Sequence, residues 1–265
     1  MGESWDDIVE RELGRYHDGE ARLPAEPDPR QKQLTRMGNA ANGAGLALLM
    51  LGRDEEAARW LGHAAERWRE SFRDAPPGSW GRPIGAVKAR LLAADEPGAE
   101  DAARWALEAG AAQAETPIGR YAATLAHLVL GDDEQARPLA SSLRERDDFP
   151  HDVADALATL AAGDRVGYVL AVETVLESFE TREEYLEDVP VADTVLVLQA
   201  LATRRELAAE LSSPLLPPGH SPSMYGCETR VTRTAPSSAS SSSSAFSTNS
   251  CHSCRTCSGL RRAVS

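Results

Sequence analysis

The chain lacks several features that would assign it to a familiar class of protein. Residues 1–216 contain no cysteine, and only Lys32 and Lys88 among the 28 basic residues are lysines. Aromatic residues make up 5% of the chain, and no apolar run reaches the ~18 residues of a membrane-spanning helix. The acidic N-terminus has no apolar core, so we expect no secretory signal. A cysteine-free body is typical of a reducing cytoplasm, where we expect the protein to reside.

Motifs of common nucleotide-binding and hydrolytic sites are also missing. The sequence has no G-x-x-x-x-G-K-[ST] loop and no G-x-S-x-G motif. The Gly-rich segment 38–45 follows no predicted strand, so its small residues favour close packing between helices instead of dinucleotide binding. A net charge of −13 and a pI of about 5.0 argue against a nucleic-acid partner. The sequence therefore predicts no cofactor, and it predicts a protein partner, with no nucleic acid and no membrane.

Composition divides the chain into residues 1–216 and residues 217–265. The second part has 14 of the 22 serines and a net charge of +4, whereas the first carries −17. So little apolar content predicts a disordered, Ser-rich tail. The excess of Arg over Lys indicates GC-rich coding DNA, and a shifted reading frame in such DNA is the alternative origin of this tail. All four cysteines lie there, as a weak metal-binding pattern or as incidental residues: Cys227, Cys251, Cys254 and Cys257.

Short turn signals that contain Gly or acidic residues recur in residues 1–216. LGRDEEA starts at residue 51, GDDEQA at 131 and GDR at 163, with a weaker DEPGAEDA at 95. Apolar residues at helical spacing flank each turn. The sequence thus predicts an all-α fold of stacked antiparallel helical hairpins, formed by segments 39–51 with 55–68, 84–94 with 99–114, 117–130 with 134–144, and 153–162 with 165–179. A last helix is expected over 191–204.

Two local patterns give more detailed expectations near the end of this region. Val166, Val169, Val172 and Leu176 are spaced by three and four residues instead of alternating, which predicts a helix and not a strand. The pair Thr181 and Glu184 has the spacing of a capping box, which predicts a short helix that stops at Pro190.

The first hairpin resembles a tetratricopeptide repeat. The resemblance rests on small and apolar residues at the repeat's positions, although Ala41 stands where the repeat has Trp and the closing Pro is missing: Gly45, Leu48, Gly52, Ala57, Leu61 and Ala64. It extends loosely over residues 40–180 and implies an α-solenoid that binds another protein. A repeat of this kind cannot bury its apolar face alone and stacks on its neighbours.

The end of the region is similar to the closing segment of an all-helical family of bacterial polymorphic-toxin immunity proteins. The residues that carry this similarity are Phe179, Arg182, Tyr185, Leu186 and the helix DTVLVLQALA at 193–202. The resemblance implies that the protein binds and neutralises a cognate toxin.

Two sets of side chains are candidates for contact with a protein partner. Trp80 lies in a loop rich in Pro and Gly, where it caps an edge of the core or anchors a partner. The acidic run Glu183, Glu184, Glu187 and Asp188 is either a solvated face or a contact for a basic partner. Adaptation to high salt is a competing explanation for the acidic charge.

The alternative function is that of an all-α metal-dependent phosphohydrolase. The dipeptide His151–Asp152 resembles the metal-binding pair of that class, and His127 and Asp193 would complete a ligand set. In the competing interpretation Asp152 caps the helix that begins at residue 153.

Overall fold

The computed structural model describes residues 3–218, and within this range the all-α prediction is confirmed. Ten α-helices and two short 3₁₀ turns are present there, and no strand. The predicted tail, including its four cysteines, lies outside the described residues apart from Pro217 and Pro218. The elements are α1 (Trp5–Ala21), α2 (Pro27–Met50), α3 (Asp54–Phe72), α4 (Gly81–Leu92), α5 (Glu96–Glu108), η1 (Ala111–Gln113), α6 (Pro117–Leu130), α7 (Asp133–Arg144), α8 (His151–Ala162), α9 (Arg165–Glu180), η2 (Leu186–Asp188) and α10 (Asp193–Thr203).

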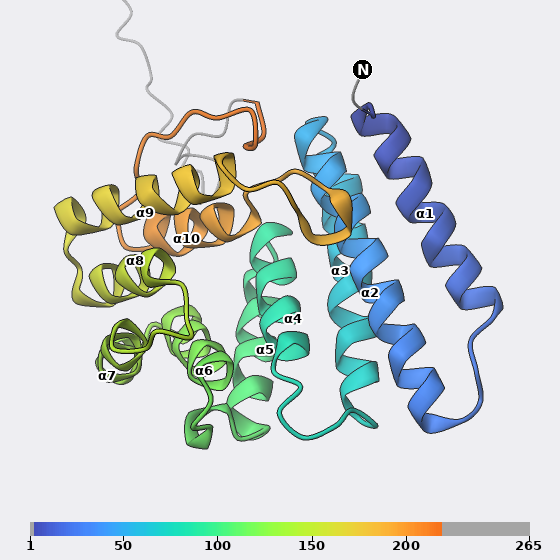
Figure 1. The fold of residues 1–265 in the computed structure, drawn as a ribbon, viewed down its shortest axis with the longest axis horizontal. Helices are drawn as coiled ribbons and strands as arrows, with labels where there is room; N and C mark the ends of the chain where they lie inside the picture. Colours follow the sequence, from blue (N-terminus) through green and yellow to red (C-terminus); the bar gives the residue numbers. More distant parts are fainter. Residues whose placement is uncertain (1–2, 219–265) are drawn as a thin grey trace, which may run out of the picture. The chain divides into compact units, whose positions relative to one another are not determined.

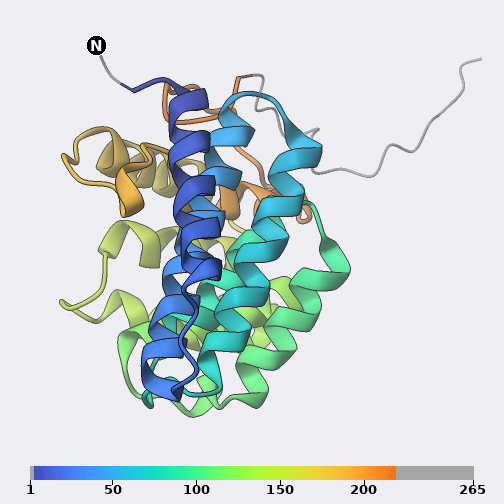
Figure 2. The same ribbon diagram turned by 90° about the vertical axis from the view of Figure 1, so that its right-hand side faces the viewer.

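Helices that follow one another in the chain pack against one another, from α1 through α9. Figures 1 and 2 both show α1, α2 and α3 running side by side, with α4 and α5 next to them. The predicted hairpins are therefore present, and apart from the start of α2 their bounds lie within about six residues of the expected ones. The sequence did not predict α1, nor that α2 begins as early as Pro27.

Left-handed residues form the turns between the helices of each hairpin. Gly52, Gly131 and Gly163 have φ values of +69°, +74° and +71°, which glycine adopts without steric cost. The weaker turn signal at 95 lacks a glycine at this point, and there Ala94 takes φ +52°. The recurring turn signals thus mark the positions where the chain reverses.

Small residues in α2 allow its neighbours to approach closely. A Cβ atom on Gly45 would lie 2.7 Å from Cγ of Leu61 in α3, and one on Gly38 would lie 2.7 Å from the Trp68 ring. Both distances are too short for a real contact, so larger residues would push α3 away. The prediction that segment 38–45 serves helix packing is confirmed.

Helix α10 is buried on all sides. Eight consecutive residues from Val195 to Ala202 are buried, and the helix packs against α4, α8 and α9. An apolar helix surface of this kind is typical of the centre of a core. Within residues 3–218, no helix combines the length and the apolarity needed to cross a membrane.

Of the two detailed expectations, the capping box is wrong and the helix over the valine-rich segment is confirmed. Thr181 is the C-terminal cap of α9, and its hydroxyl donates to the Glu177 carbonyl 2.9 Å away. It therefore does not open a helix, and the segment before Pro190 contains only the 3₁₀ turn η2. The buried face of α9 is formed by Tyr168, Val172, Val175, Leu176 and Phe179, whereas Val166 faces solvent. The apolar spacing identified the helix but not the face that it buries.

Candidate functional site

The proposed metal ligands are not brought together. Within residues 3–218, no group of three or more His, Cys, Asp and Glu side chains is placed to hold a metal ion. Asp193 pairs with Lys88 at 2.5 Å, and Nδ1 of His127 lies 3.2 Å from the Asp132 carboxylate without hydrogen-bond geometry. His151 begins α8 after Pro150. The expected cap is also wrong, because Asp152 lies inside the helix and accepts only from the N–H of Val153, at 2.9 Å.

The acidic run is divided by the fold. Glu183, Glu184 and Asp188 are exposed. Glu187 instead turns toward α1 and α2, and only 17% of its side chain is accessible. Its carboxylate pairs with Arg15 and accepts from the Asn39 amide at 3.0 Å.

Backbone geometry places Glu187 in this position. Glu187 and Asp188 both have left-handed φ values, +55° and +58°, which are unfavourable for residues with a Cβ. Arg11 Nη2 donates to the Glu187 carbonyl at 3.0 Å. The contacts from α1 and α2 therefore hold this strained turn, so the Glu187 carboxylate serves the fold.

Trp80 lies at the edge of a cleft of about 370 Å³. It is half-buried, precedes α4 and packs on Phe72 with a centroid distance of 6.4 Å. Asp193 and Leu186 line the same cleft. Trp80 and Asp193, which the sequence assigned to two different functions, thus lie around one hollow between α2 and α4.

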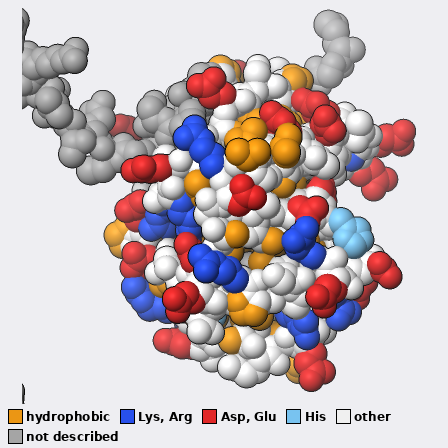
Figure 3. Space-filling view, turned by 90° about the vertical axis from the view of Figure 1, so that its left-hand side faces the viewer, with side chains coloured by type: hydrophobic (Ala, Val, Ile, Leu, Met, Phe, Trp, Pro, Cys, Tyr) orange, Lys and Arg blue, Asp and Glu red, His pale blue; other side chains and the backbone are white. Residues whose placement is uncertain are grey.

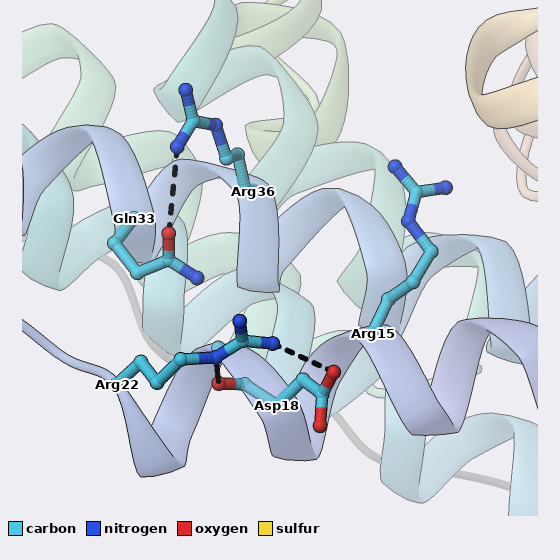
Figure 4. Close-up of a pocket in the computed structure, with 6 residues that line it drawn as sticks. Arg15, Asp18, Arg22, Gln33 and Arg36 are labelled. Carbon is cyan, nitrogen blue, oxygen red and sulfur yellow. Dashed lines mark hydrogen bonds and ion pairs between the residues drawn. The ribbon is translucent and has the colours of Figure 1, made fainter.

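A second hollow, of about 340 Å³, lies between α1 and α2 and carries three arginines. Figure 4 shows that their side chains do not converge. Arg22 bonds Asp18 at 2.7 Å, Arg36 reaches Gln33 at 3.5 Å, and Arg15 points away from both. This hollow does not form a common site for an anion.

The outer face of α9 carries two large aliphatic side chains in solvent. Val166 is 73% exposed and Leu170, one turn later, is 62% exposed. In the view of Figure 3, hydrophobic side chains gather in a patch with charged side chains around it. Exposed apolar groups that lie together, bordered by polar residues, are typical of a protein–protein contact.

The same helix face continues into an acidic hollow of about 240 Å³. Glu173 and Glu177 follow Leu170 at helical spacing, and Glu180 and Glu210 complete the acidic lining. No Lys or Arg lines this hollow, and none of the four glutamates forms an ion pair with a basic residue in the described part of the chain. Aliphatic contact and unpaired negative charge therefore lie along one stripe, the α9 stripe: Val166, Leu170, Glu173 and Glu177.

A buried hydrogen-bond network positions the far side of this hollow. The Tyr168 hydroxyl donates to Oε1 of Gln199 at 2.9 Å. Gln199 in turn bonds both backbone groups of Ala209, at 2.6 and 3.1 Å. The segment that carries Glu210 and Leu211 is thereby fixed against α10 beside α9.

Sequence reasoning missed the α9 stripe although a signal was present. Helix α9 contains more apolar residues than one buried face can hold, since Tyr168, Val172, Val175 and Phe179 already form that face. Val166 and Leu170 are the excess, and an excess of this kind predicts a second contact.

Comparisons of the chain with models of protein families, with curated proteins and with solved structures find no match.

Proposed function

We propose that this protein is a non-catalytic binding module that recognises another protein through the α9 stripe. The observation that supports the proposal is the alignment of Val166 and Leu170, both more than half exposed, with unpaired Glu173 and Glu177. Adaptation to high salt explains acidic side chains but not aliphatic ones in solvent. A binding contact explains both.

The chemistry of the stripe indicates the chemistry of the partner. Aliphatic side chains that are one turn apart match an apolar ridge on a partner helix. The four glutamates of the hollow favour Lys or Arg next to that ridge, because complementary charge speeds encounter and excludes acidic proteins. The partner in this proposal is therefore a basic protein with an amphipathic surface segment.

The sharpest form of the proposal is an immunity protein that neutralises a cognate toxin. The resemblance at residues 179–202 and the acidic contact surface both favour it. Its prediction is that the partner is a toxin whose activity is inhibited by one equivalent of this protein.

The test is capture of partners from source cells with the tagged full chain and with the double variant Val166→Asp/Leu170→Asp. We expect one basic partner, retained in stoichiometric amount by the wild type and reduced at least about tenfold by the variant, which is about 1.4 kcal/mol. Raising the salt concentration should weaken the complex.

Ile118→Asp is the matched control, since Ile118 is an exposed aliphatic residue of α6, 43% accessible. It receives the same chemical change away from the acidic hollow and should retain the partner. Equal capture by the double variant, an acidic partner, or no stoichiometric partner for any form of the protein would contradict the proposal.

A further inference from the structure

The cleft next to Trp80 contains a cation that no carboxylate neutralises. Arg82 lies in the first turn of α4 and lines the cleft. It forms no ion pair with an acidic residue in the described range, although the chain has 41 acidic residues. The other cation of the cleft, Lys88, is neutralised by Asp193 at 2.5 Å and also donates to Thr194 at 3.1 Å. The cleft therefore keeps one net positive charge.

Neutral oxygen atoms hold the Arg82 guanidinium in one orientation. Nε donates to the hydroxyls of Thr35 at 3.2 Å and Ser71 at 2.9 Å, and Nη2 donates to Oε1 of Gln31 at 2.6 Å. The Thr35 hydroxyl donates its proton to the backbone carbonyl of Gln31, and the Ser71 hydroxyl donates to that of Trp68. Both oxygens are therefore free to accept from Arg82. Nη1 donates to no residue in the described part of the chain. One end of the guanidinium is thus fixed, and the other end remains available for an oxyanion.

The position of Arg82 is unfavourable without an anion. The first turn of a helix carries partial positive charge, and α4 has no acidic residue there. Burial lowers the pKa of Arg82, as expected for a cation with no charged partner. A bound anion would offset both effects.

Asn42 adds an unpartnered amide to the same cleft. Its residue exposure is 7%, and its side chain makes no hydrogen bond to another residue within 3–218. The amide atoms are not fully enclosed, since among the described residues the enclosed side-chain atom without a partner is Nδ1 of His127, so the Asn42 amide is accessible to a ligand or water in the cleft. Next to it, the Trp68 indole N–H donates to the side-chain oxygen Oδ1 of Asn39 at 3.1 Å, which fixes the ring as a wall of the cleft.

We propose that this cleft binds a small organic anion whose carboxylate or phosphate group pairs with Nη1 of Arg82. The amide of Asn42 bonds the polar part of the ligand, and its apolar part lies against Trp80, Ile84 and Leu186. A volume of about 370 Å³ suits a ligand of small-metabolite size. This site uses none of the residues of the α9 stripe, so it stands or fails independently of the proposed protein contact.

The test is a titration of the full chain with three probes, followed by the indole N–H signals of Trp68 and Trp80 in NMR spectra. Benzoate and phenyl phosphate carry the two oxyanions, and benzamide has the shape of benzoate without its charge. We expect saturable shifts with at least one anion at millimolar concentration or below, and binding of benzamide at least about tenfold weaker. The relative affinity of the two anions decides between carboxylate and phosphate.

Two variants test the residues, with Arg36→Gln as the control for loss of one exposed positive charge. Arg82→Gln should reduce anion affinity at least about tenfold, whereas Arg36→Gln should leave it unchanged. If Arg82→Gln fails to fold, Asn42→Leu replaces the amide and should reduce anion affinity in a folded protein. The proposal is overturned by equal binding of benzoate and benzamide, by anion binding that survives these cleft substitutions in folded protein, or by no shift with either anion up to about 10 mM.

Discussion

Glu177 and Glu187 lie ten residues apart in one acidic stretch, yet their carboxylates have opposite surroundings. Glu187 is held by Arg15 and Asn39 and is largely withdrawn from solvent. Glu177 lines an open hollow with three other glutamates and pairs with no base in the described residues. A carboxylate with internal partners contributes to stability, and one without them remains available to a ligand. Arg82 combines both features, because neutral oxygen atoms hold its guanidinium in place and no carboxylate of the described residues neutralises its charge.

The largest effect is expected where a buried group supports the acidic hollow from inside. Gln199→Leu would leave the Tyr168 hydroxyl and the backbone of Ala209 without their partner. Each of these three losses costs about 1–3 kcal/mol, so we expect the free energy of unfolding in urea to fall by at least about 3 kcal/mol. The control Gln113→Leu changes an exposed glutamine and should stay within about 0.5 kcal/mol. Equal stability of the two variants would refute the network.

Alkaline pH should lower the free energy of unfolding, because three groups with raised pKa values lie in the core. Burial raises the pKa of the Tyr121 and Tyr168 phenols above the ordinary value near 10. For Lys88, burial lowers the pKa, but Asp193 and the phenol oxygen of Tyr121 more than offset this, so it too is raised. The folded state therefore binds more protons than the unfolded state above about pH 10.

The stability from these groups is fully present below pH 10 and is lost as pH rises, by about 1.4 kcal/mol per pH unit for each group. Urea unfolding between pH 8 and about pH 11.5 measures the loss. Tyr168→Phe should have a shallower dependence on pH than the wild type, because it lacks one of the titrating groups. An unfolding free energy that is constant across this range would show that the groups are not buried as described.

A substitution pair tests the division of the acidic run. Glu187→Ala removes the partner of Arg15 and Asn39 and should lower the free energy of unfolding by roughly 1–2 kcal/mol. Glu183→Ala, at an exposed position four residues earlier, should change it by less than about 0.5 kcal/mol. Thermal or urea unfolding of both variants measures the difference. A larger loss of stability for Glu183→Ala than for Glu187→Ala would mean that Glu183, and not Glu187, is the residue that supports the fold.

The smallest effect on stability is expected at the α9 stripe. Val166 and Leu170 bury little surface, so the double change to Asp should alter unfolding by no more than about 0.5 kcal/mol. The same variant is expected to lose the protein partner. A large loss of stability would show instead that these side chains serve the fold.

Local signals in the sequence were sufficient for the hairpins but not for the sites. Gly52, Gly131 and Gly163 mark turns that any chain with this spacing must make, so the helices between them could be predicted. The direction of Glu187 depends on Arg15, 172 residues away in the chain, and no periodicity reports such a contact. Arg82 is held by Gln31 and Thr35 of α2, about 50 residues earlier in the chain, and the spacing of residues does not predict such a contact either.

The face that α9 buries could not be read from the sequence for a related reason. Spacing by three and four residues identifies a helix, but apolar residues also lie on the outer face of α9, at Val166 and Leu170. Packing against α8 and α10 selects the face that is buried. Tyr168 lies on the buried face, where its hydroxyl donates to Gln199, a contact that the spacing does not reveal.

The most direct measurement is hydrogen exchange of the full chain, alone and in complex with the captured partner, followed by mass spectrometry of peptides. The account predicts slower exchange in peptides from 165–180 and 207–213, with no change in peptides from α2 and α4 around the cleft. Protection confined to other helices, with unchanged exchange in α9, would contradict the assignment of the α9 stripe as the binding surface.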